Sequence, residues 1–207
     1  MLAAIALAIA QPRILVAYHT ETNRTGSLAA LVAAGAHNAG AEVRLLPVSN
    51  VSCEDMLWYD GLALGSPVFW GTVSGRMKLF LDDVQQRCFG WPVMELRWRA
   101  GAAFATGAHE ASGKSATINA LHTFMLSVQM VVLGNEPAAN CLLGACATNR
   151  NESAATPTWT QQEMADADAL GKRLVQAATA LKPLMPPPPP PPCAPGVHRC
   201  GVHFITD

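Results

Sequence analysis

The chain has 207 residues, of which 50% are hydrophobic and 14% are charged, and its formal net charge is -1. This length suits one α/β domain with additional segments at its ends. The chain has no excess of Lys and Arg to neutralise a nucleic-acid backbone, so we expect that it does not bind nucleic acid.

Residues 1–12 are predicted to form an apolar N-terminal extension. They include Ala8-Ile9-Ala10, which resembles a small-residue cleavage site, but no basic region precedes it and the segment is shorter than a usual signal peptide. It is also too short to cross a bilayer. We therefore expect a simple extension of a cytoplasmic protein, with a truncated targeting signal as the alternative.

Residues 13–182 alternate between strand-like and helical patterns, which predicts a doubly wound three-layer α/β/α domain with a parallel sheet. Strands are expected at 13–18, 42–47, 60–65, 101–106 and 130–134, the last resuming near Leu142-Leu143. Helices are expected at 26–38, 74–87, 113–127 and 161–181, with Ser74 capping the second and a capping box from Thr160 to Glu163 opening the last. The five strands are expected in the flavodoxin-like order 2-1-3-4-5.

Three polar loops follow three of these strands and should meet at the carboxyl edge of the sheet, where open α/β sheets bind ligands. Loop one consists of Thr20, Glu21, Thr22, Asn23, Arg24 and Thr25. Loop two consists of Pro67, Val68, Phe69, Trp70 and Gly71. Loop three contributes Thr106, Gly107, Ala108, His109, Glu110 and Gly113. All of these residues are candidates for binding one cofactor.

Loop one has the features of a phosphate site, because threonine hydroxyls and the start of a helix supply hydrogen-bond donors and a positive dipole end. The chain has neither a Walker lysine nor a Gly-x-Gly-x-x-Gly motif, so a single phosphomonoester is favoured over a triphosphate or a dinucleotide. The alternative is an ordinary helix start capped by Ser or Thr.

Loops two and three have the features of a site for a flat ring. Phe69 and Trp70 can stack on an isoalloxazine, and Gly71 allows a close approach of the backbone. Loop three can offer backbone N–H groups to a pyrimidine edge. Aromatic residues that fill a core or a subunit interface are the alternative for loop two. Together the loops predict flavin mononucleotide (FMN).

The C-terminal residues 183–207 are predicted to be a disordered tail. Seven consecutive prolines from Pro186 to Pro192 should form a stiff polyproline II rod, which serves as a spacer or, alternatively, as a ligand for a proline-reading domain. The six cysteines match no zinc framework. Cys193 and Cys200, with nearby histidines, allow a tail metal site or disulfide, although free thiols are favoured, and no metal is expected in the domain.

The longest segment that resembles a known protein family is residues 65–82, G-S-P-V-F-W-G-T-V-S-G-R-M-K-L-F-L-D. This run resembles a segment of the flavodoxin-like NAD(P)H:quinone oxidoreductases, the type once named for binding the tryptophan repressor. Loop three and residues 157–173 are similar to further parts of the family, so the likeness covers about residues 13–181. The family's H-H-G-M motif, in which one His touches the ring or the substrate, is replaced here by Ser127-Val128-Gln129-Met130.

The resemblance implies bound FMN, NADH or NADPH as co-substrate, a quinone as acceptor and a homo-oligomer, either a dimer or a tetramer. It also implies that residues 148–151 approach the cofactor. Because the flavin carries the chemistry, no catalytic protein residue is expected, and His109 is the one candidate for relaying a proton. The expected reaction is a ping-pong transfer of two electrons. The alternatives are a non-catalytic FMN-binding or scaffold protein and a single-electron carrier of the flavodoxin type.

Overall fold

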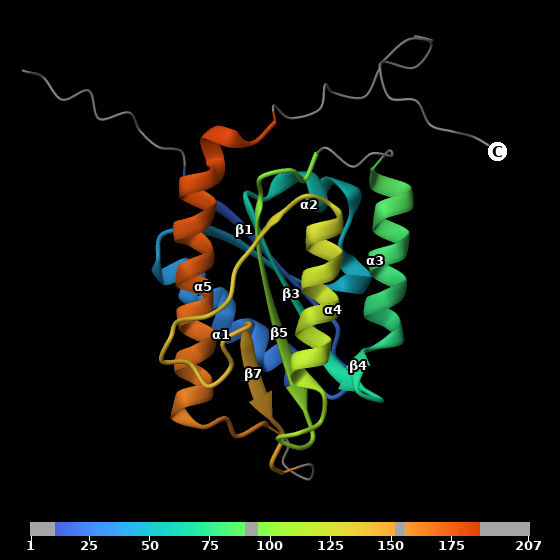
Figure 1. Cartoon of the computed structure of the whole chain (residues 1–207), viewed down its shortest axis with the longest axis vertical. Helices are drawn as coiled ribbons and strands as arrows, with labels where there is room; N and C mark the ends of the chain where they lie inside the picture. Colours follow the sequence, from blue (N-terminus) through green and yellow to red (C-terminus); the bar gives the residue numbers. More distant parts are fainter. Residues whose placement is uncertain (1–10, 90–94, 152–155, 187–207) are drawn as a thin grey trace, which may run out of the picture.

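A computed structural model describes residues 11–89, 95–151 and 156–186 and shows a parallel sheet between two layers of helices (Figure 1). The sheet follows the order β2 (Glu42–Pro47), β1 (Arg13–Tyr18), β3 (Gly61–Phe69) and β5 (Ala100–Gly107). Beyond β5, the next position in the sheet is shared by β6 (Val131–Val132) and β7 (Ala145–Thr148), which both pair with β5 in parallel. The predicted class is therefore confirmed, whereas the strand count and order differ slightly from the predicted five strands, because the fifth strand is divided into β6 and β7 and a further short strand pairs with β3.

The helices divide between the two faces of the sheet. α1 (Arg24–Asn38) and α5 (Gln161–Leu181) cover one face, whereas α2 (Cys53–Trp58), α3 (Gly75–Cys88) and α4 (Lys114–Ser127) cover the other (Figure 1). Successive residues of the central strands enter opposite cores, as the two-residue period of a strand requires. Leu62 and Leu64 pack with α2, α3 and α4, whereas Ala63 packs with α1 and α5.

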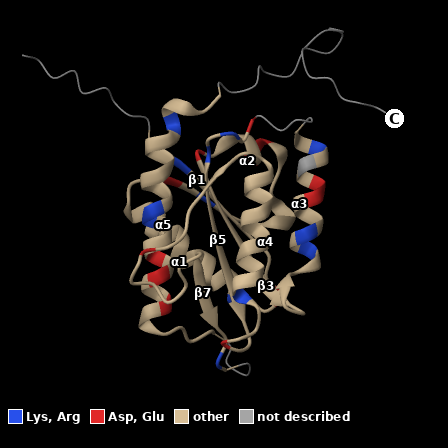
Figure 2. Cartoon of the chain, in the orientation of Figure 1, with Lys and Arg blue, Asp and Glu red and all other residues tan. Residues whose placement is uncertain are grey.

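Helix starts are capped as the sequence predicts. The Ser74 side chain accepts a hydrogen bond from Met77 N at the start of α3. Thr160 and Glu163 form the reciprocal capping box that opens α5. Acidic residues lie in the first half of α5 and basic residues follow them (Figure 2). Glu163 lies in the first turn, where a negative charge complements the helix dipole.

Several predicted boundaries were wrong. The third strand does not end at Gly65 but continues to Phe69, then turns back into the short antiparallel strand β4 (Thr72–Val73). α1 begins at Arg24, two residues earlier than expected. The short helices α2 and η1 (Val48–Asn50) were not predicted, because neither is long enough to show a helical period.

The expected resumption of the fifth strand near Leu142 and Leu143 was also wrong. Both leucines are exposed, and the strand resumes at Ala145. The buried Asn135 side chain donates hydrogen bonds to Gly144 O and Asp166 O, each at 2.9 Å, and so fixes the preceding residues as a loop. Side-chain bonds of this kind compete with strand pairing.

The contact between α1 and α5 depends on two glycines. A Cβ atom on Gly35 would lie 2.2 Å from Asp168 O, and one on Gly171 would lie 2.2 Å from Val32 O. No side chain can occupy these positions without separating the helices. The close approach seats α5 directly on the sheet face that carries β1 and β3.

Two disulfides join cysteines whose pairing was not predicted from the sequence. Cys53–Cys88 connects α2 to α3, and Cys141–Cys146 closes the loop before β7. Disulfides persist mainly in oxidising compartments, so the expected cytoplasmic location stays a prediction. Within the part of the chain that the structure describes, no helix has both the length and the hydropathy needed to span a membrane.

The two ends of the domain meet at one carboxylate. Asp60 accepts hydrogen bonds from Arg13 N at 2.9 Å and from Lys182 Nζ at 2.8 Å. Burial alone would raise the pKa of Asp60, but hydrogen bonds from Lys182 and Arg13 hold it below its ordinary value. Most of the predicted extension at 1–12 and of the predicted tail at 183–207 lies outside the described residues, so those predictions stay open.

Candidate functional site

The three polar loops come together around one cavity at the carboxyl edge of the sheet. This cavity, of about 450 Å³, is called the loop cavity below. It lies between the ends of β1 and β3, where the strand order reverses, and reaches the end of β5. Its lining consists of Thr20, Glu21, Thr22, Arg24, Thr25, Pro67, Val68, Phe69, Thr106, Gly107, Ala108 and Asn149.

Loop one presents helix-terminal donors to the loop cavity. Asn23 precedes α1 in the left-handed conformation, with φ of 58°, and its side chain forms no capping bond with the first turn. The first backbone N–H groups of a helix have no partner within the helix. The turn between Thr22 and Thr25 therefore offers N–H groups and hydroxyls together, as phosphate-binding turns do.

Side chains of loop one also bind the other walls of the cavity. Thr25 Oγ1 lies 2.7 Å from Thr106 Oγ1, which joins loop one to loop three in the protein interior. Arg24 donates a hydrogen bond to Asn151 O at 3.1 Å. The region 148–151, which the family likeness placed near the cofactor, thus contacts loop one and contributes Asn149 to the cavity lining.

Loop two is the end of a β-hairpin, whereas an irregular loop was expected. Phe69 is the last residue of β3, and Trp70 and Gly71 form the turn with φ of 51° and 88°. Trp70 is fully exposed and Phe69 is 41% exposed. Pro67, Val68 and Phe69 line the loop cavity, but Trp70 and Gly71 lie beyond its lining at the hairpin tip.

Loop three separates the loop cavity from a larger one. Ala108 faces the loop cavity, whereas Glu110 and Gly113 line a neighbouring cavity of about 1010 Å³, called the disulfide cavity below because Cys141 and Cys146 also line it. The candidate His109 is exposed, and it is not among the described residues that line either cavity. The candidate role of His109 in proton relay therefore stays a prediction.

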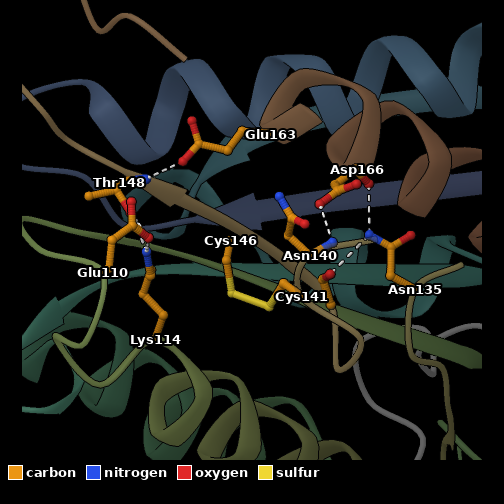
Figure 3. Close-up of a disulfide and its surroundings, with 10 residues drawn as sticks. Glu110, Lys114, Asn135, Asn140, Cys141, Cys146, Thr148, Glu163 and Asp166 are labelled. Carbon is orange, nitrogen blue, oxygen red and sulfur yellow. Dashed lines mark hydrogen bonds and ion pairs between the residues drawn. A yellow bond between two sulfur atoms is a disulfide. The ribbon is translucent and has the colours of Figure 1, made fainter. Parts of the chain in front are cut away.

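A partly buried polar network supports loop three from the side of the disulfide cavity (Figure 3). The Lys114 ammonium donates to Glu110 and to Thr148 Oγ1, and Thr148 N donates to Glu163 at 2.8 Å. Arg150 bridges Glu110 at 2.7 Å and Glu163 at 2.8 Å. This network fixes the end of β7 against loop three, next to Asn149.

The carboxylates of this network stay ionised. The hydrogen bond from Thr148 is the main cause that lowers the pKa of Glu110. Burial alone would raise the pKa of Glu163, but hydrogen bonds from Arg150, Thr160 and Thr148 hold it below the ordinary value. The sequence did not reveal the contacts of Lys114 with Thr148, of Thr148 with Glu163 and of Arg150 with Glu110, because these partners lie 34, 15 and 40 positions apart in the chain.

The residues that stand here in place of the family's H-H-G-M motif lie away from the loop cavity. Ser127 ends α4, and Gln129 O accepts a hydrogen bond from Trp98 N at 3.2 Å, just before β5 begins. α4 starts beside loop three, so its other end lies at the amino edge of the sheet (Figure 1). The Ser127-Val128-Gln129-Met130 sequence therefore removes no side chain from the described lining of the loop cavity.

The cavity itself contains few groups that could perform acid–base or nucleophilic chemistry. Its ionisable lining residues are Glu21 and Arg24. The loop cavity is lined by the turn at the start of α1, by the aromatic side chain of Phe69 and by the small residues Gly107 and Ala108. These features suit the binding of a flat molecule that carries a phosphate.

Comparisons with known proteins agree with this geometry. The model of the NADPH-dependent FMN reductase family matches residues 50–144. The chain is 37% identical over 123 residues to a flavodoxin from Aquifex aeolicus and covers 64% of that protein, slightly less than two thirds of its length. It is 27% identical over 194 residues to an NAD(P)H dehydrogenase (quinone) from Archaeoglobus fulgidus, covering 82% of this chain and 98% of the relative.

A solved structure shares the fold. A WrbA-like flavodoxin from Agrobacterium tumefaciens superposes with a TM-score of 0.66 and 18% identity, covering 82% of this chain and 99% of that one. The chain therefore has the flavodoxin fold and is similar in sequence to the NADPH-dependent FMN reductase family and to NAD(P)H dehydrogenases (quinone), in agreement with the resemblance found in the sequence.

Proposed function

We propose that this protein is an FMN-dependent oxidoreductase that transfers two electrons from NADH or NADPH to a quinone. The observation that carries the proposal is that all three predicted loops line a single cavity at the point where the strand order reverses. Its volume of about 450 Å³ lies within the range of cofactor sites. The relatives' names add the nicotinamide and the quinone.

The lining residues fit FMN in their chemistry. In the proposal, Thr20, Thr22 and Thr25 hold the phosphate together with the first N–H groups of α1. Phe69 contacts the ring from loop two, since aromatic surfaces stack on flat conjugated molecules. The backbone of Gly107 and Ala108 binds the polar edge of the ring.

Bound FMN would supply the redox chemistry, accepting a hydride from the nicotinamide and delivering the electron pair to the quinone in a ping-pong order. The protein's contribution is binding and orientation. Thr25 and Thr106 keep loops one and three at a fixed separation through their hydrogen bond. Arg24 holds the segment after β7 against loop one.

Absorption spectroscopy and steady-state kinetics test the proposal. Purified protein with added FMN should show flavin bands that bleach with NADPH or NADH and recover with benzoquinone, and double-reciprocal plots should be parallel. Absence of flavin binding would contradict the proposal. Converging plots would contradict the ping-pong order, and bound flavin without turnover would favour the non-catalytic alternative.

A pair of matched variants connects this activity to the loop cavity. Ala108 lines the cavity, so Ala108→Trp should fill it and reduce FMN affinity at least tenfold. Ala116 is exposed on α4 and lies outside the cavity lining, so Ala116→Trp should leave the affinity unchanged. Equal effects of the two substitutions would place the flavin elsewhere.

A further inference from the structure

Loop one contains a carboxylate where a phosphate is expected to bind. Glu21 lies between Thr20 and Thr22, and all three residues line the loop cavity. A glutamate carboxylate and a phosphate dianion repel each other strongly at short range, most of all where water is scarce. A Glu21 side chain that was free to enter the cavity would therefore oppose the binding of any phosphorylated ligand.

The Glu21 carboxylate is bound on the opposite side of loop one. Its Oε1 atom lies 3.2 Å from His19 Nε2 and 3.5 Å from Arg76 Nε. His19 and Arg76 line a different cavity, of about 860 Å³, between loop one and α3, and they are absent from the described lining of the loop cavity. The charged end of Glu21 is thus directed toward α3.

His19 provides a fixed attachment for this carboxylate. Only 6% of the residue is exposed, and its Nδ1 atom lies 2.8 Å from the hydroxyl of the fully buried Ser74. Ser74 Oγ accepts from Met77 N as the cap of α3, so its own hydrogen is free to donate to His19 Nδ1. With Nδ1 as the acceptor, the neutral ring carries its hydrogen on Nε2 and donates it to Glu21.

The protonation balance of His19 agrees with this assignment. Burial lowers the pKa of His19, and Arg76 lowers it further, while Glu21 acts in the opposite direction. The net effect favours the neutral ring. Arg76 then supplies the positive charge that compensates the Glu21 carboxylate, and the hydrogen bond from His19 fixes the orientation of that carboxylate.

We propose that His19, together with Arg76, is a positioning residue that holds the Glu21 carboxylate away from the phosphate position and so allows loop one to bind a phosphorylated flavin. This inference rests on the proposed function. It predicts that the loss of His19 weakens FMN binding through the charge of Glu21, and that binding of riboflavin, which has no phosphate, is spared.

Fluorescence titrations with FMN and with riboflavin test this prediction. His19→Leu should lower FMN affinity at least tenfold and change riboflavin affinity less than twofold. The double variant with His19→Leu and Glu21→Gln should recover FMN affinity to within threefold of wild type, because the repelling charge is gone. His122→Leu, which removes a histidine of α4 that lies outside the loop cavity, is the matched control and should change neither affinity.

The variant Arg76→Met is a second test of the same inference. Because Arg76 is exposed on α3, its replacement should not disturb folding, even if His19→Leu does. It should weaken FMN binding and spare riboflavin, and Glu21→Gln should again restore the loss. Equal loss of both ligands, or no recovery with Glu21→Gln, would overturn the inference. Wild-type protein that binds neither flavin would contradict the proposed function itself and remove the inference with it.

Discussion

At the scale of single residues, Trp70 has a solvent exposure and a backbone conformation that are both unfavourable for a large apolar side chain. It is fully exposed, and its φ of 51° lies in the left-handed region that bulky residues avoid. Neither packing nor backbone preference explains the choice. Strained residues of this kind are concentrated at ligand sites, and Trp70 directly follows Phe69, which lines the loop cavity.

We therefore predict that Trp70→Asn raises the free energy of unfolding by about 1 kcal/mol, because Asn tolerates the left-handed conformation. FMN affinity should fall in the same variant. Urea denaturation and flavin titration measure the two effects. Trp98 is a matched control, since it also has positive φ, 66°, but lies before β5 at the far edge of the sheet. Trp98→Asn should leave flavin affinity unchanged, and a loss of affinity there would weaken the case for Trp70.

At the scale of elements, periodicity and capping were enough to place the long helices and the central strands. Ser74 and the Thr160 to Glu163 box marked helix starts because each cap is a local interaction. The loops at the carboxyl ends of β1, β3 and β5 could also be predicted from local sequence, because each is a polar segment that directly follows an apolar run.

Features that depend on distant partners could not be predicted in this way. The hairpin turn at Trp70 and Gly71 gives no helical or strand period, and the disulfide between Cys53 and Cys88 joins residues 35 positions apart. His19 was visible only as the first polar residue after a strand. Its contact with Ser74 appears only when β1 and α3 are folded together.

The packing of α1 on α5 gives a prediction at this scale. Gly171→Ala should lower the free energy of unfolding by about 1–3 kcal/mol, because the new methyl group would overlap the backbone of α1. Gly75 opens α3 and has no atom within 4 Å of the position of an added Cβ. Gly75→Ala should therefore be neutral or slightly stabilising, by less than about 1 kcal/mol. Thermal and urea denaturation of both variants would check the difference, and similar losses would contradict it.

At the scale of the whole molecule, buried ionisable groups predict sensitivity to acid. Burial lowers the pKa of His19 and of His122, so the unfolded chain takes up protons first as the pH falls below about 6.5, the ordinary value for histidine. The free energy of unfolding should decrease from that point downward. A second decrease should follow below about pH 4.5, where Asp60 and Glu163 lose the stabilisation that their lowered pKa values provide.

Urea denaturation at a series of pH values measures both phases. His122→Gln should flatten the first phase, and His37→Gln, at an exposed position of α1, should not. A stability curve that stays level between pH 7 and 5 in the wild-type protein would rule out the proposed contribution of the histidines.

The attachment of both domain ends to Asp60 has a practical consequence. Arg13 is the first residue of β1, so Arg13 and Lys182 meet at Asp60 at the amino edge of the sheet, on the side opposite the three loops. A solid support coupled beside Asp60 would stand on the side of the domain opposite the loop cavity. Anchored in this way to an electrode, the domain would turn the loop cavity outward to the solution.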